Sequence, residues 1–207
     1  MPLSNAAKAR LKREVMLLQK DPPPGIQAQP KDEGENLQHW TATIEGPRDS
    51  PFAGVSFTVQ MEIPPRYPLE PPSCQFVGSV MPFHPNIDGQ GRICLDTLKR
   101  PPSGTWSPAV SLTSLLLSLQ LLLGEPNADD GLMPEISKLY QSSREAWHQE
   151  AKRKLLELQE QQQTMISNSS NSRDTAPTSE VLAGHKREKN NLDMEKTPSS
   201  KRQKSSY

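Results

Sequence analysis

The sequence predicts an α+β fold in which helices flank a four-stranded antiparallel meander sheet. Between residues 25 and 77, short segments alternate apolar and polar residues, as strands with one buried face do. The loops between these segments are too short for the crossovers that parallel strands require, so the strands should pair antiparallel. Helical patterns precede and follow this region, and an apolar segment at 110–123 has the length of a buried helix.

The first predicted helix begins after Ser4 and ends at Lys20. Serine is preferred at the start of a helix because its hydroxyl accepts a hydrogen bond from a backbone N–H there. Three prolines follow Asp21 and stop the helix. Leu11 and Leu18 recur at helical spacing, so this side of the helix should face the core.

Four short strands are predicted next, in the segments 25–29, 37–44, 55–63 and 73–77. The first is weakly patterned, whereas the second places Trp40, Ala42 and Ile44 on one face by strict alternation. The third alternates in the same way and ends at Pro64, since proline lacks the N–H that a strand interior needs. This pattern predicts a sheet with one buried and one polar face.

Proline and glycine are dense between residues 80 and 110, which predicts a long irregular segment. Loops of this length inside a domain usually carry function. The next segment, 110–123, is apolar on nearly all sides and should form a buried central helix. After a break at 126–131, a short helix at 134–141 and a long helix at 143–163 complete the predicted domain.

Composition divides the 207 residues into a folded domain at 1–163 and a tail at 164–207. The domain holds 16 Lys and Arg against 19 Asp and Glu (net −3), and the tail holds 8 against 5 (net +3). This balance excludes a polycation that coats nucleic acid, so no direct nucleic-acid partner is expected. Ser, Asn, Lys and Thr dominate the tail, which should be disordered. Its basic segment 201–204 is typical of a nuclear-import signal, so the expected location is the nucleus, with the cytoplasm second.

The chain has two cysteines, Cys74 and Cys94, too few for a disulfide framework. Cys74 lies in an apolar strand and is expected in the core. The amino terminus lacks the apolar region of a signal peptide, and no apolar segment is long enough to span a bilayer. We therefore expect an intracellular protein in a reducing compartment, without a membrane partner.

Cys94 is the candidate nucleophile. It follows Asn86 by eight residues across a turn that contains Gly89 and Gly91. A thiol that carries an acyl group needs exposure, a neighbour that stabilises negative charge, and a backbone that holds the two together. The amide of Asn86 can donate a hydrogen bond without titrating. The alternative is a turn with a buried cysteine at its end, which is the usual state of a free cysteine.

Four motifs in the same order resemble the ubiquitin-conjugating enzyme family over about residues 7–160. They are Tyr67-Pro68-Leu69-Glu70-Pro71-Pro72, His84-Pro85-Asn86 with Cys94-Leu95-Asp96, Trp106-Ser107-Pro108, and Pro126-Asn127-Ala128-Asp129-Asp130. The resemblance implies the ubiquitin-conjugating fold, with one N-terminal helix, a central helix and two C-terminal helices around the sheet. It also implies an acyltransferase that accepts ubiquitin as a thioester from the activating enzyme and passes it to a substrate lysine.

The insert at 101–104 and the basic tail resemble the T-type conjugating enzyme, which partners the ligase subunit of the Fanconi anaemia core complex. That resemblance implies monoubiquitination in DNA repair with a RING-type ligase. Leu69 stands where the T-type usually has Phe, and the segment 106–109 resembles the broadly used D-type enzymes. A general-purpose D-like enzyme is therefore one alternative, and an enzyme for another ubiquitin-like modifier is a second.

The resemblance assigns catalytic roles to three residues and a gating role to a fourth. Cys94 would hold the thioester, Asn86 would stabilise the oxyanion, and Asp130 would orient and deprotonate the incoming lysine. Leu132 would shape a gate beside the cysteine. Two structural alternatives stay open, in which Asn86 braces its loop and Asp130 caps a helix together with Asp129.

Other positions match contacts of the family. Lys12 and Arg13 correspond to residues that meet the activating enzyme, although a solvated basic surface also explains them. Three residues correspond to the docking site of a RING-type ligase: Leu69, Pro108 and Ala109. Lys99 is close enough in sequence to Cys94 for self-modification, and His84 is expected to be structural.

No metal or cofactor is expected, because ATP is consumed by the activating enzyme, and the chain should be a monomer. Two further classes stay open. One is a binding module that only presents ubiquitin, although such variants lack the cysteine that this chain has at Cys94. The other is a cysteine hydrolase, which would need a histidine base beside that thiol.

Overall fold

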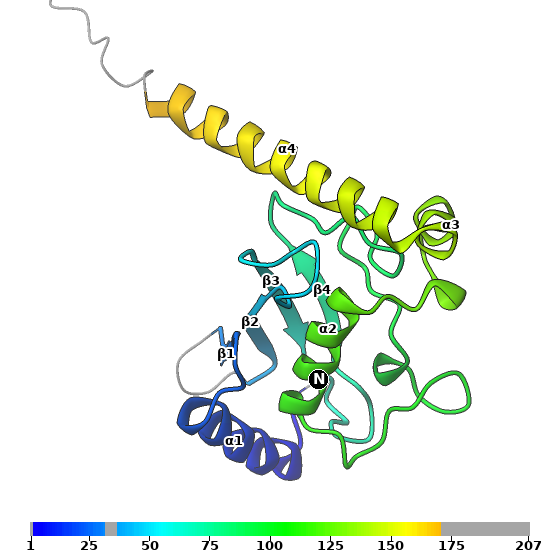
Figure 1. The fold of residues 1–207 in the computed structure, drawn as a ribbon. Helices are drawn as coiled ribbons and strands as arrows, with labels where there is room; N and C mark the ends of the chain where they lie inside the picture. Colours follow the sequence, from blue (N-terminus) through cyan, green and yellow to red (C-terminus); the bar gives the residue numbers. More distant parts are fainter. Residues whose placement is uncertain (1, 32–36, 171–207) are drawn as a thin grey trace, which may run out of the picture. The chain divides into compact units, whose positions relative to one another are not determined.

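The computed structural model describes residues 2–31 and 37–170, with backbone only for 166–170, and confirms the predicted α+β fold (Figure 1). Its helices and strands are α1 (Asn5–Lys20), β1 (Ile26–Pro30), β2 (His39–Glu45), β3 (Ser56–Glu62), β4 (Ser73–Val77), α2 (Leu112–Gly124), α3 (Pro134–Ser142) and α4 (Arg144–Ser170). Two short 3-10 turns, η1 (Asp96–Leu98) and η2 (Ala128–Asp130), lie before and after α2.

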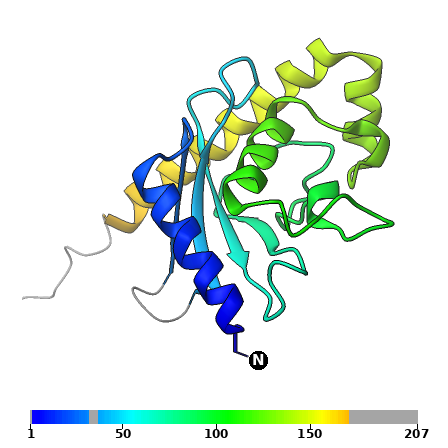
Figure 2. The same cartoon turned by 90° about the horizontal axis from the view of Figure 1, so that it is seen from below.

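The four strands form one antiparallel sheet in the order β1-β2-β3-β4, as the short connections predict. Alternation sets the register, because one face must be buried. Trp40 pairs with Met61, and Ile44 pairs with Phe57. All four side chains are buried. Figure 2 shows α1 beside the β1 edge of the sheet and α2 across one face.

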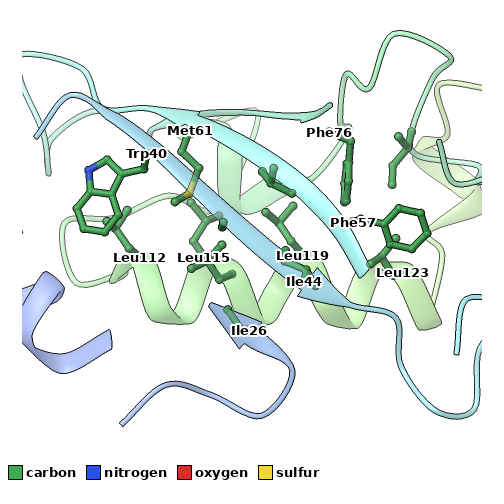
Figure 3. Packing of buried hydrophobic residues seen from close by; sticks show 14 of the residues in the cluster. Ile26, Trp40, Ile44, Phe57, Met61, Phe76, Leu112, Leu115, Leu119 and Leu123 are labelled. Carbon is green, nitrogen blue, oxygen red and sulfur yellow. The ribbon is translucent and has the colours of Figure 1, made fainter. Parts of the chain in front are cut away.

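The core lies between the sheet and α2. Figure 3 shows leucines of α2 pointing toward side chains of the sheet. Leu112, Leu115 and Leu119 are fully buried there. The prediction that this helix is buried on nearly all sides is wrong, because Leu117 is 42% exposed and Leu121 is 60% exposed. One helix face is enough to cover the sheet, so the opposite face is left to solvent.

Side-chain caps explain where two helices begin. The hydroxyl of Ser4 accepts a hydrogen bond from the N–H of Ala7 at 3.1 Å, as predicted for the start of α1. The hydroxyl of Ser111 accepts one from the N–H of Ser114 at 3.1 Å and starts α2. The N-terminus of α2 is thereby held close to the irregular segment that precedes it.

α4 extends to Ser170, beyond the predicted end at residue 163. Trp147, Ala151 and Leu155 form its buried stripe. The sequence after that stripe has no glycine or proline before Ser170, so nothing in it stops the helix at residue 163. The predicted boundary between domain and tail therefore falls inside a helix, and the basic segment 201–204 lies outside the described residues. Within 2–31 and 37–170, no helix is both long and apolar enough to cross a membrane.

Candidate active site

A folded turn holds the backbone of Cys94. The Cys94 N–H donates to the carbonyl of Asn86 at 2.9 Å. In the turn between them, Asp88 accepts from the N–H of Arg92 at 2.9 Å. Gly91 has φ +80°, and a Cβ there would lie 1.9 Å from the carbonyl oxygen of Phe76. Glycine is therefore required at this position, and the turn holds Cys94 at the end of a rigid segment, 86–94, which we call the Cys94 strip.

His84 is part of the framework and has no exposed surface. Its Nε2 lies 2.7 Å from the carbonyl oxygen of Leu122, and its Nδ1 accepts from the N–H of Asn86 at 3.0 Å. These contacts require a neutral ring with the proton on Nε2. Burial lowers the pKa of His84 to about 4, which keeps the ring neutral at physiological pH. This geometry agrees with a structural role.

The buried His84 ring makes stability depend on pH. The unfolded chain binds a proton near the ordinary histidine pKa of about 6.5, whereas the folded chain binds it only near 4. The stabilising effect is therefore complete above the unfolded value and is lost as pH falls toward 4. Between about pH 7.5 and about pH 5, we expect the free energy of unfolding to fall by about 2 kcal/mol through this residue.

Urea denaturation at the two pH values measures this loss. The matched control is His84→Gln, whose amide can still donate to the Leu122 carbonyl but does not titrate. The variant should be less stable than wild type at pH 7.5 and should lose about 2 kcal/mol less on acidification. An equal loss in both proteins would contradict the assignment.

The side chain of Asn86 is also buried, with no exposed surface. Its Nδ2 donates to the carbonyl of Asn127 at 2.8 Å and to the carbonyl of Asp130 at 3.1 Å. Its Oδ1 accepts from the N–H of Asn127 at 2.9 Å. The amide thus links the Cys94 strip to η2, and both of its donor hydrogens are in use. The alternative in which Asn86 braces its loop matches this arrangement.

Two side chains, those of Asp130 and Lys99, meet at the thiol of Cys94. Its Sγ donates to Oδ2 of Asp130 at 3.0 Å. The Nζ of Lys99 lies 3.1 Å from Sγ and 2.9 Å from the same Oδ2. Asp130 comes from η2 and Lys99 from the end of η1, so two segments separated by α2 converge on the cysteine. We call Cys94, Lys99 and Asp130 the active-site triangle.

The insert at 101–104 supports Lys99. The N–H of Trp106 donates to the carbonyl of Lys99 at 3.0 Å, after the chain has turned back. A Cβ on Gly104 would lie 2.4 Å from that same carbonyl oxygen. The insert therefore packs directly against the backbone that carries the lysine of the triangle.

The charges of the triangle are mutually dependent. Burial raises the pKa of the Cys94 thiol, the hydrogen bond to Asp130 raises it further, and Lys99 opposes both. The hydrogen bond from Lys99 holds the pKa of Asp130 below its usual range. The hydrogen bonds of Lys99 with Asp130 and with Cys94 raise the pKa of Lys99. At neutral pH the resting site therefore holds a thiol, a carboxylate and an ammonium, and the carboxylate accepts the hydrogen bond of the thiol.

The remaining predicted residues are exposed on the surface of the domain. Leu132 follows η2 and is 42% exposed. Lys12 and Arg13 are exposed on α1. The three ligase-docking candidates are all exposed: Leu69, Pro108 and Ala109. None of these six residues belongs to the triangle.

Two contacts were missed by the sequence analysis. The carboxylate of Asp129 accepts a hydrogen bond from the side chain of Gln141 on α3 at 3.0 Å, so it is engaged with α3, whereas Asp130 contacts the Cys94 thiol. Glu14 on α1 is 4% exposed and gathers several hydrogen bonds, although its sequence position resembles that of an ordinary surface acid. Its place between apolar residues at helical spacing was the available signal. Within the part of the chain that is described, no group of three or more His, Cys, Asp or Glu side chains is arranged to hold a metal ion.

Comparison with known proteins is specific. A family model described as "Ubiquitin-conjugating enzyme" matches residues 10–155. The protein named "Ubiquitin-conjugating enzyme E2 T" from Xenopus laevis is 44% identical over 145 residues, which cover 70% of this chain and 73% of the relative. The proteins of the same name from Danio rerio (44%, covering 70% and 73%) and Homo sapiens (43%, covering 70% and 71%) are similar over the same length.

Proposed function

The chain belongs to the ubiquitin-conjugating enzyme family, and we propose that it carries ubiquitin as a thioester on Cys94 and transfers it to lysine. Enzymes of this family work with ubiquitin, an activating enzyme and ligases. The single observation that supports Cys94 as the carrier is the active-site triangle, in which the thiol donates to Asp130 at 3.0 Å. No metal or cofactor takes part in the proposed reaction.

In the loading step, the Cys94 sulfur attacks the C-terminal carbonyl of ubiquitin on the activating enzyme. A new C–S bond forms, the C–S bond to the activating enzyme breaks, and that enzyme's thiolate leaves. The proton on Cys94 passes to Oδ2 of Asp130 or to water. Lys99 stands 3.1 Å from the sulfur and favours the negative charge that develops there.

In the transfer step, a lysine amine attacks the thioester carbonyl, the C–N bond forms, and the Cys94 thiolate leaves. A free lysine is protonated near neutral pH and must lose that proton before it attacks. Asp130 is the proposed acceptor and orienting group. Asn86 supports this step by holding the backbone of Asp130, and a direct contact with the oxyanion requires one of its two carbonyl contacts to open.

Replacing Asp130 should separate the two steps. In Asp130→Ala we expect loading by the activating enzyme to be retained, while transfer to free lysine falls at least about tenfold, because the amine loses its acceptor. Single-turnover discharge of the preloaded enzyme measures this. The matched control is Asp129→Ala, since that carboxylate contacts Gln141 instead of the thiol. Equal loss of loading and transfer would make Asp130 a structural residue.

Lys99 is the proposed site of self-modification, because its amine already lies where an acceptor lysine would lie. Its raised pKa keeps it protonated, so the reaction should be slow at neutral pH and faster at higher pH. Lys99→Arg keeps the charge and removes the acceptor. Mass spectrometry of the loaded enzyme should find a ubiquitin remnant on Lys99 in wild type, and persistence of the modified band in the variant would place the acceptor elsewhere.

We further propose a RING-type ligase as partner, a nuclear location, and monoubiquitination in DNA repair through the ligase subunit of the Fanconi anaemia core complex. The similarity to relatives named E2 T and the insert at 101–104 support this assignment. The alternative is a D-like general-purpose enzyme, which Leu69 favours. Discharge rates with the Fanconi RING subunit and with a RING domain that serves D-type enzymes distinguish the two, because acceleration by the second alone would contradict the repair assignment.

A further inference from the structure

Glu14 is a buried carboxylate far from the active-site triangle in the sequence, and it is fully satisfied. Its Oε1 accepts from the Nε of Arg10 at 2.5 Å and from the hydroxyl of Tyr67 at 2.8 Å. Its Oε2 accepts from the N–H of Leu112, the first residue of α2, at 2.8 Å. A buried charge is costly unless it is paired and hydrogen-bonded, so these three contacts are needed for Glu14 to remain inside.

Arg10 extends the same network to the loop before α2. Its two terminal nitrogens donate to the carbonyls of Pro108 at 2.9 Å and of Val110 at 3.1 Å. Its guanidinium also lies 6.0 Å from the centre of the Tyr67 ring. The planar fork of arginine makes these contacts together with the Glu14 pair, which the single ammonium of a lysine does not do.

The Arg10–Glu14 pair is therefore hydrogen-bonded to two separate loops. The first loop contains Tyr67 and, two residues later, Leu69, whose side chain is 57% exposed. The second contains Pro108 and Ala109, both exposed. The loops also meet each other, because the indole Nε1 of Trp106 donates to the carbonyl of Pro68 at 2.9 Å.

We propose that Arg10 and Glu14 are positioning residues for ligase docking. They do not touch the ligase but set the spacing between the Leu69 loop and the Pro108 loop, so that the exposed apolar side chains form one surface. This inference rests on the proposed docking site. A small apolar surface contributes little binding energy unless it is preorganised, because ordering the loops on binding lowers the affinity.

The test uses Arg10→Lys, which keeps the charge beside Glu14 but cannot hold both carbonyls and the carboxylate together. Ubiquitin transfer to lysine is measured on the full-length, preloaded enzyme over a titration of the RING domain. We expect the RING concentration for half-maximal stimulation to rise about tenfold, with the rate at saturation recovered, because the loops are ordered by excess ligase. Tyr67→Phe, which removes one hydrogen bond to Glu14 and no exposed surface, should shift it in the same direction by less.

Arg153→Lys is the matched control. Arg153 pairs with Glu150 and Glu157 on α4, so the same substitution removes a comparable contact away from the loops, and the titration should stay as in wild type. A wild-type titration for Arg10→Lys, with only a lower unfolding temperature, would overturn the inference and leave the pair a purely stabilising contact.

The variant Leu69→Ala tests the proposed docking site itself, independently of the positioning role of Arg10 and Glu14. If the RING domain stimulates wild type and Leu69→Ala loses that response, the docking site stands, and the Arg10→Lys result decides the inference alone. If Leu69→Ala responds as wild type does, the docking site is wrong and the positioning role is overturned with it.

Discussion

Cys94→Ala should form no ubiquitin adduct at all with the activating enzyme, ubiquitin and ATP. The reason is that the acyl group has no sulfur to accept it. The second cysteine cannot substitute, because burial raises the pKa of Cys74 to about 12 and leaves almost no thiolate at neutral pH. A non-reducing gel measures the result: wild type gives a band heavier by one ubiquitin that disappears with reductant, and the variant gives none.

Two further proteins complete that experiment. Cys74→Ala is the matched control and should load as wild type does, while Cys94→Ser should form an ester that resists reductant. A wild-type adduct with another ubiquitin-like modifier, and none with ubiquitin, would select that alternative. If wild type loads no modifier of any kind, the chain is a binding module and the catalytic assignment of Cys94 is wrong.

Asn86→Ala should have the second-largest effect, on stability and on transfer. The substitution leaves the N–H and carbonyl of Asn127 and the carbonyl of Asp130 without their side-chain partner. Unpaired polar groups in a partly buried site cost about 1–3 kcal/mol each, so we expect the free energy of unfolding to fall by about 3 kcal/mol. Transfer to lysine should slow by about 100-fold, as on loss of an oxyanion donor or its support. Urea denaturation and single-turnover discharge measure the two effects.

A double-mutant cycle with Asp130→Ala distinguishes how Asn86 acts. If Asn86 works by holding Asp130 in place, the double variant should transfer ubiquitin no more slowly than the slower single variant. If its amide contacts the oxyanion directly, the two losses should multiply. The geometry, with both amide hydrogens bound to backbone carbonyls, favours the first outcome.

Much of the fold followed from local pattern. Alternation along residues 37–44 and 55–63 predicted strands close to β2 and β3, and the cap at Ser4 predicted the start of α1. Local pattern failed where packing decides the outcome. The largely apolar sequence of α2 did not reveal that Leu117 and Leu121 would face solvent, because the way the helix packs on the sheet decides which of its faces is covered.

The sequence by itself determined the strand order, the family, and the spacing that makes Cys94 and Asn86 neighbours on one turn. The short connections between strands, the four ordered motifs and the eight-residue spacing can each be read along the chain. Tertiary structure alone decided which charged groups meet. Asp130 reaches Cys94 across 36 positions, and Glu14 reaches Leu112 across 98. Such contacts depend on how the helices and loops pack on the sheet, and a charged side chain carries no local pattern that names its distant partner.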